Sequence, residues 1–164
     1  MIKRSHLDEY IGLGWPAPSQ MERYFLGRPE ERWPFEGGTD SWGLKVEGVD
    51  GTGHLEEGKG RIDIHLTMVA NHHCGVLLQY RKYGGGFPIT CYSEHDLSRL
   101  RDWVRTVHGD LMPIGLFIPY EDAWKAVKEF IGTNGALPTS IVWIAGRDVP
   151  AYAFPDPADN VAGR

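Results

Sequence analysis

Two neighbouring segments of alternating character constrain the fold of this chain most strongly. From 62 to 68, apolar residues alternate with polar ones, and the same period of two recurs from 74 to 81. Such alternation is typical of β-strands that bury one face. The polar residues 71–73 between the segments favour a turn, so the two segments are predicted to form an antiparallel β-hairpin.

Further strands are predicted on both sides of the hairpin. Residues 42–49 form one candidate strand. Residues 87–92 form another, after three glycines at 84–86 that indicate a turn, because no Lys-Ser or Lys-Thr follows them as a phosphate-binding loop requires. Apolar runs at 114–118 and 141–144 indicate two more strands. Strands in this succession favour a mainly antiparallel sheet of about five strands.

Two main helices are predicted to pack on this sheet. Ser93 and Asp96 fit the capping box that begins a helix, and apolar residues follow at helical spacing over 94–108. Pro119 favours the start of a second helix, in which acidic residues precede basic ones, as the helix dipole prefers. These elements predict the α+β fold class.

The first 40 residues carry a weaker pattern. They hold four prolines, which break long elements. We expect residues 1–40 to be irregular apart from a short helix over 19–26. Trp15, Trp33 and Phe35 are expected to hold this segment against the core.

The length of 164 residues is close to that of one domain. We therefore expect a single domain over residues 1–164, with its core at 41–145. The tail at 155–164 is rich in Pro, Asp, Ala and Gly, and is expected to be flexible.

Charge and hydropathy argue against several classes of protein. The formal net charge is −5, and basic residues never cluster beyond Arg81 and Lys82, which argues against direct nucleic-acid binding. No apolar run approaches the roughly 18 residues of a transmembrane helix, and the N-terminus does not resemble a signal peptide. We expect no membrane contact and a cytoplasmic location, with Cys74 and Cys91 reduced.

Histidines and cysteines supply the candidate chemical groups. Residues 72–74 are His-His-Cys, but alternate side chains of a hairpin point apart, so we expect a polar turn and no metal or other cofactor. Cys91 and His95 are close enough in sequence to form a nucleophile and its base, although no recognised nucleophile motif surrounds them. A small-molecule-binding domain or enzyme with a cleft near Cys91, His95 and Tyr92 is therefore the alternative function.

The C-terminal half resembles a known family. The apolar run 112–119 is followed by a helical pattern at 120–130 that ends in Phe, and then by Leu-Pro-Thr-Ser-Ile-Val-Trp at 137–143. This succession resembles the closing segment of the first numbered immunity-protein family of bacterial polymorphic-toxin systems. Strand 75–80 also resembles the family's middle strands, so the resemblance covers about residues 60–145. The predicted helix at 94–108 departs from the family, in which we expect a shorter link there in many members.

The resemblance implies an immunity protein, which neutralises a cognate toxin by direct binding and has no catalysis of its own. The toxic domain would be a nuclease or a nucleic-acid deaminase. Because enzymes that act on nucleic acid have basic clefts, an acidic partner is steered toward them. The candidate toxin interface therefore consists of the acidic loop residues Glu30, Glu31, Glu56 and Glu57. A third hypothesis is a regulatory module that oligomerises through an open sheet edge.

Overall fold

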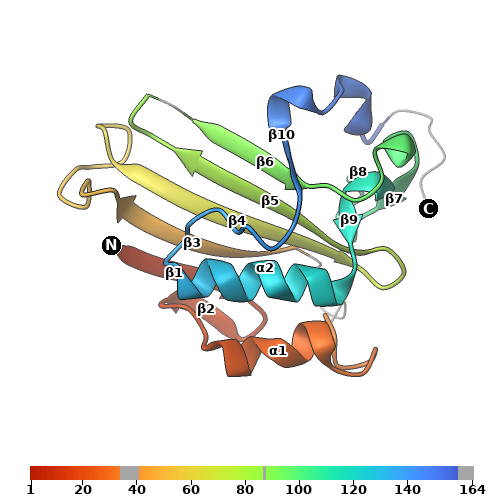
Figure 1. Ribbon diagram of the computed structural model, residues 1–164, viewed down its shortest axis with the longest axis horizontal. Helices are drawn as coiled ribbons and strands as arrows, with labels where there is room; N and C mark the ends of the chain where they lie inside the picture. The colour runs from red at the N-terminus through yellow and green to blue at the C-terminus, as the bar shows by residue number, and fades with distance from the viewer. Residues whose placement is uncertain (34–40, 87, 159–164) are drawn as a thin grey trace.

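An antiparallel sheet with two helices on one face forms the body of the molecule (Figure 1). The computed structural model describes residues 1–33, 41–86 and 88–158. Within these residues, eight strands form the sheet in the order β10-β6-β5-β4-β3-β1-β2, and β9 joins β5 beyond the end of β6. The strands are β1 (Ile2–Leu7), β2 (Tyr10–Leu13), β3 (Ser41–Val49), β4 (Ile62–Asn71), β5 (Gly75–Tyr83), β6 (Ile89–Ser93), β9 (Phe117–Ile118) and β10 (Trp143–Ala145). The helices are α1 (Pro18–Leu26) and α2 (Tyr120–Gly132).

The predicted hairpin is confirmed as β4 and β5, which pair antiparallel from Asp63 and Tyr83 to Asn71 and Gly75. In the turn, the Asn71 side-chain oxygen accepts hydrogen bonds from the backbone N–H groups of His73 and Cys74, at 2.8 and 3.0 Å. Gly75 follows with φ of +107°, and a Cβ there would collide with the backbone carbonyl of Ile118 on β9. The turn residues are therefore selected by local hydrogen bonds and by the close approach of β9.

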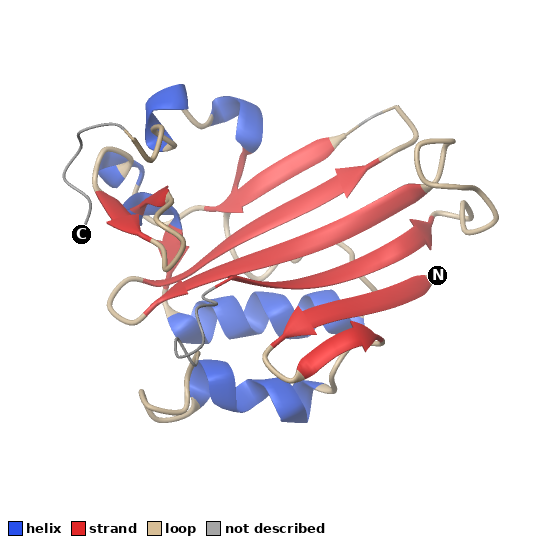
Figure 2. Cartoon of the chain, turned by 180° about the vertical axis from the view of Figure 1, so that it is seen from behind, coloured by secondary structure: helices blue, strands red, loops and turns tan. Residues whose placement is uncertain are grey.

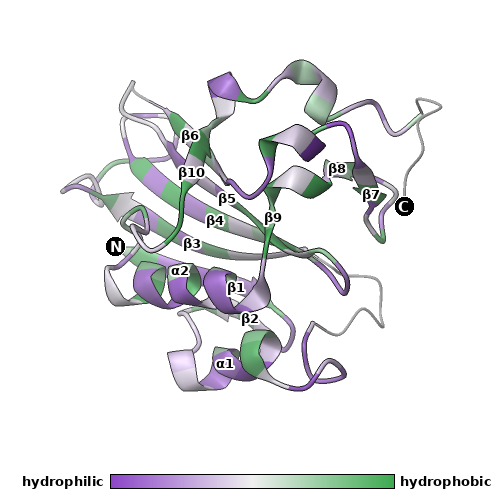
Figure 3. Cartoon of the chain, turned by 45° about the vertical axis from the view of Figure 1, so that its right-hand side comes forward, coloured by the Kyte–Doolittle hydropathy of each residue, from purple (hydrophilic) through white to green (hydrophobic). Residues whose placement is uncertain are grey.

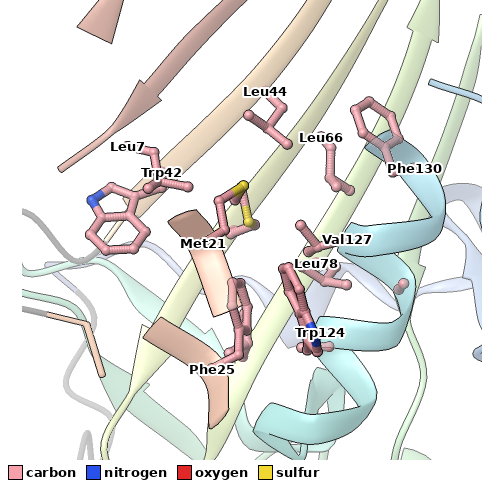
Figure 4. Close-up of a cluster of buried hydrophobic side chains, with 14 of the residues drawn as sticks. Leu7, Met21, Phe25, Trp42, Leu44, Leu66, Leu78, Trp124, Val127 and Phe130 are labelled. Carbon is pink, nitrogen blue, oxygen red and sulfur yellow. The ribbon is translucent and has the colours of Figure 1, made fainter. Parts of the chain in front are cut away.

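The main core lies between the sheet and the two helices. Trp124, Val127 and Phe130 of α2 point toward the inward-facing side chains of β3, β4 and β5, and α1 adds Met21 and Phe25 (Figure 4). The Phe25 and Trp124 rings stack with their centroids 5.4 Å apart, which joins the two helices. This packing confirms that α1 and α2 cover the same face of the sheet.

The N-terminal segment is not irregular, so that expectation was wrong. Residues 1–40 contain β1 and β2 as well as the expected short helix α1. β1 pairs with β3 over five residue pairs, and its inward side chains Ser5 and Leu7 are buried. Such pairing depends on a partner strand about 40 residues away, which a local pattern does not reveal. Trp33 is buried as expected, whereas Phe35 lies outside the described residues.

The predicted helix at 94–108 is also wrong. Its start, Ser93, lies at the end of β6, and Asp96 caps only a 3₁₀ turn at Leu97–Arg99. The chain then forms β7 (Trp103–Arg105), which pairs with β8 (Leu111–Pro113) in a separate two-stranded sheet. The backbone N–H groups of His95 and Asp96 both donate to the carbonyl of Gly115. This long-range contact replaces the helical hydrogen bonds that a capping box would begin.

The fold class is confirmed as α+β with a mostly antiparallel sheet and two helices, but the sheet has more than the expected five strands. The strands that the sequence did not predict are β1 and β2. In the apolar run at 114–118, only the last two residues form a strand, β9, after a 3₁₀ turn at Ile114–Leu116. No described helix has both the length and the apolar character needed to cross a membrane. The part of the tail beyond 158 lies outside the described residues.

A smaller apolar cluster lies on the other face of the sheet, at one end. It joins Val69 and Leu77 of the sheet to residues of β7, of β9 and of the C-terminal segment. The Trp103 indole N–H donates to the carbonyl of Ala153 at 3.0 Å, which holds the C-terminal segment in place. Along β4 and β5, hydrophobic and hydrophilic bands alternate (Figure 3), so the rest of this face carries mainly polar side chains.

Candidate binding surface on the open face of the sheet

The face of the sheet that points away from α1 and α2 is the candidate functional surface. Seen from behind, no other described element crosses the middle of β3, β4 and β5 (Figure 2). We call this the open face. Because opposed residues of paired strands share a face, the strand register identifies its side chains. They are Arg4 and His6 of β1, Gly43, Lys45 and Glu47 of β3, Asp63, His65 and Thr67 of β4, Gln79, Arg81 and Tyr83 of β5, and Thr90 and Tyr92 of β6.

One row of these side chains runs straight across four strands. Arg4 opposes Lys45, Lys45 opposes His65, and His65 opposes Arg81. We call these four residues the basic row. Arg81 is exposed, and the other three side chains are partly or largely accessible from the open face. The sequence shows no sign of this row because its members are about 16 to 40 positions apart.

Carboxylates lie along one side of the basic row. The Glu47 carboxylate is 3.0 Å from the Arg4 guanidinium and 3.7 Å from the Lys45 ammonium group. Asp63, whose side chain is buried, accepts two hydrogen bonds of 2.9 Å from Arg61. Arg61 also lies 3.7 Å from Glu47. The two carboxylates are thus shared among three cations at the end of the row near β1 and β3.

His65 lies between two cations, and its pKa is lowered. Burial is the main cause, because it disfavours the charged imidazolium, and the positive charges of Arg81 and Lys45 add to the effect. His65 is therefore neutral at pH 7. In this state it separates Lys45 from Arg81 without adding a further positive charge.

A cavity of about 320 Å³ lies beside the basic row on the same face. His6 and His65 come from the sheet, and His108 reaches the cavity from the turn between β7 and β8. Gly43 leaves room here, since a Cβ at this position would lie 2.6 Å from Nε2 of His65. Within the described residues, no group of three or more His, Cys, Asp or Glu side chains is arranged to hold a metal ion.

A second cavity, of about 440 Å³, lies at the end of the sheet near the β4–β5 turn. Its lining combines polar and apolar side chains, namely Asn71, His73, Cys74, His95, Arg99, Val104, Ile114 and Phe117. The expected pair of Cys91 and His95 does not assemble around it. Cys91 packs against the main core on the helical side of the sheet, where burial raises its thiol pKa. Cys91 and His95 thus lie in different surroundings, one against the main core and the other at the cavity.

Tyr92, the third residue of that alternative, lies on the open face. Its hydroxyl accepts a hydrogen bond from the Gln79 side-chain amide at 3.0 Å, and its ring packs beside Phe154 with centroids 5.2 Å apart. Tyr92 and Cys91 thus point to opposite faces of β6, as neighbours in a strand must.

The four nominated glutamates are exposed but do not form one patch. The loop with Glu30 and Glu31 follows α1, whereas the loop with Glu56 and Glu57 joins β3 to β4, at the opposite end of the molecule (Figure 1). Each carboxylate has a nearby cation within its own loop or at the start of β4. Arg28 lies 3.4 Å from Glu30 and 2.9 Å from Glu31, Lys59 lies 2.9 Å from Glu56, and Arg61 lies 3.7 Å from Glu57.

Comparisons of this chain with protein-family models, with curated proteins and with solved structures find no match.

Proposed function

We propose that this chain is an immunity protein that neutralises a cognate bacterial toxin by direct binding. The observation that carries the proposal is the succession of elements over 112–143, which resembles the closing segment of the first numbered immunity-protein family. This region forms β9, then α2, then a turn, then β10. The proposal requires a stable scaffold that presents a surface to a partner.

The turn between α2 and β10 supports such a scaffold role. The Glu129 carboxylate accepts hydrogen bonds from the backbone N–H groups of Thr139 and Ser140, at 2.8 and 3.1 Å. The Trp143 indole N–H donates to the carbonyl of Pro138 at 2.8 Å. The residues that make up the resemblance are thus occupied in holding α2 against the sheet, and the surface that meets a partner must lie elsewhere.

The open face is suited to protein binding. It combines charged side chains with Tyr83, Tyr92 and Gln79. Aromatic residues and arginine are enriched among the interface residues that contribute most of the binding energy. The partner in this proposal is the toxic domain of an effector, a nuclease or a nucleic-acid deaminase. The chain itself would act without catalysis, in the cytoplasm of the cell that it protects.

The test is to co-express the chain with the C-terminal toxic domain of the effector encoded by a neighbouring gene. We expect the chain to restore growth and to bind the purified domain with nanomolar to micromolar affinity, as protein interfaces of ordinary size do. Failure both to bind and to protect would refute the proposal. Sedimentation at several concentrations in the same experiment separates toxin binding from self-association.

The nominated glutamates are tested in the same system. Replacing Glu30 and Glu31, or Glu56 and Glu57, by alanine should slow association with a basic toxin cleft and weaken its salt dependence. The two double variants serve as controls for each other, because their loops lie at opposite ends of the molecule. Unchanged association kinetics in both would remove these loops from the interface.

A small-molecule-binding domain or enzyme is the second candidate, and the cavity beside His95 favours it. Its volume of about 440 Å³ is within the range of ligand sites, about 300–1,000 Å³. His73, His95 and Arg99 supply polar groups, while Ile114 and Phe117 supply an apolar wall. A ligand that raises the melting temperature of the wild type, but not of a His95→Ala variant, would support this function over toxin binding.

A further inference from the structure

The basic row is an unusual arrangement of charge for a sheet. Like charges directly opposite one another on neighbouring strands destabilise the pair, because their Cβ atoms are about 5 Å apart. Here Arg4 faces Lys45 across one strand pair, and Lys45 and Arg81 flank the same residue, His65. The lowered pKa of His65 has both cations among its causes. The basic row thus gathers three cations, Arg4, Lys45 and Arg81, on the open face.

The chain's own carboxylates neutralise the cations of the basic row unevenly. Glu47 and Asp63 serve Arg4, Lys45 and Arg61 at one end. At the other end, Arg81 has no carboxylate within salt-bridge distance among the residues that the structure describes. Its guanidinium carbon lies 5.2 Å from the centroid of the Tyr83 ring, in a cation–π contact. Arg81 is therefore exposed, held over an aromatic ring and open to an external anion.

We propose that the basic row is the docking surface for an acidic segment, rich in Asp or Glu, on the toxin partner. This inference rests on the proposed function and adds to it the binding face and the sign of the partner's charge. The carboxylates of the partner would pair with Arg81, and the flanking Tyr83 and Tyr92 rings would exclude water around the pair.

The pattern of charge favours a protein partner over nucleic acid. A phosphate backbone is a continuous line of negative charge, and Glu47 and Asp63 lie beside the row where they would repel it. The chain as a whole has a net charge of −5, which opposes non-specific attraction to nucleic acid. An acidic protein segment can present carboxylates at the Arg81 end alone. Because a nuclease's phosphate-binding cleft is basic, such a segment lies outside that cleft.

The experiment reverses one charge on each side of the molecule. Arg81→Glu changes the basic row, and Lys128→Glu makes the same change of charge on the exposed side of α2, away from the open face. Affinity for the neighbouring toxin's purified C-terminal domain is measured for the wild type and both variants at about 50 and 300 mM salt. We expect Arg81→Glu to weaken binding at least about tenfold and to flatten the salt dependence. Lys128→Glu should stay within about threefold of the wild type.

The possible outcomes distinguish the docking surface from the immunity function. If the wild type binds and the two variants behave alike, the docking surface is wrong while the immunity function stands. If the wild type binds no toxin, both proposals fail. If the wild type binds a 20-nucleotide DNA duplex and Arg81→Glu abolishes this binding, the row serves nucleic acid and the inference is overturned.

Folding is controlled independently of binding. Arg81→Glu removes a contact with the Tyr83 ring but no buried group, so its melting temperature should stay within about 4 °C of that of the wild type. An Arg81→Gln variant, which keeps size and polarity but removes the charge, should give an intermediate loss of toxin affinity. An Arg81→Gln variant that binds as tightly as the wild type would contradict the charge-based docking.

Discussion

Ser93 joins three parts of the fold, and its removal tests how the sheet is assembled. β6 pairs with β5 at residues 79–82, and β9 pairs with β5 at 76 and 77. Leu78 lies between these two stretches. Its backbone N–H donates to the Ser93 hydroxyl at 2.9 Å, and that hydroxyl donates to the carbonyl of Leu116 at 2.6 Å. Ser93 is fully buried, so no solvent replaces it.

The cost of Ser93→Ala follows from these two hydrogen bonds. The substitution leaves the Leu78 N–H and the Leu116 carbonyl without the Ser93 hydroxyl, and each buried polar group left unpaired costs about 1–3 kcal/mol. The smaller, apolar alanine side chain offsets little of this. We expect a total loss of about 2–4 kcal/mol in the free energy of unfolding, which for a chain of this length lowers the melting temperature by about 5–15 °C.

Urea denaturation followed by circular dichroism measures this loss, with Ser98→Ala as the control. The Ser98 hydroxyl also donates a hydrogen bond of 2.6 Å, but to Asp96 at an exposed position. Its removal should therefore cost less than about 0.5 kcal/mol. If Ser93→Ala unfolds within about 0.5 kcal/mol of the wild type, the junction between β6 and β9 does not depend on the hydroxyl, and the reasoning fails.

Two further predictions concern the buried carboxylate and the hairpin turn. Burial alone would raise the pKa of Asp63, but its hydrogen bonds with Arg61 and with the Gly48 N–H hold the pKa below its ordinary value. The stabilisation is therefore complete above the unfolded-state pKa of about 4 and is lost as the pH falls through the lower folded-state value. Asp63→Asn should cost about 2–3 kcal/mol at pH 7, and urea midpoints should converge with those of the wild type near pH 2. Gly75→Ala should cost at least about 2 kcal/mol in the same assay, whereas Gly109→Ala, also at positive φ but with open space around a Cβ, should cost only about 1 kcal/mol.

Local sequence patterns correctly predicted the elements that do not depend on distant parts of the chain. The alternation of β4 and β5 and the amphipathic α2 depend on neighbouring residues, so the sequence was sufficient for both. β1 and β2 were missed, because β2 is largely exposed and β1 is defined by pairing with β3 across α1. The capping pattern at Ser93 misled for the opposite reason. The Ser93 hydroxyl bonds the distant backbone groups of Leu78 and Leu116, and such partners cannot be identified from adjacent residues.

The candidate surface was harder to predict than the fold because it depends on register. Lys45, His65 and Arg81 each occupy a polar position of an alternating strand, which the sequence shows. Only the pairing of β3, β4 and β5 places them in one line. A shift of one residue in any pair would send one of them to the core side. The sequence therefore identified these three residues as outward-facing, but it missed Arg4, which lies in the segment expected to be irregular, and could not bring the row together.

The basic row also changes what the net charge of −5 can explain. The acidic loops were nominated because the family resemblance implied a toxin with a basic cleft, yet Arg28, Lys59 and Arg61 already lie within 4 Å of their carboxylates. Fields of such paired charges largely cancel beyond the Debye length of about 8 Å. Arg81, by contrast, has no described carboxylate to cancel it. A partner approaching the open face at close range is therefore selected by the local excess of positive charge, even though the chain as a whole is negative.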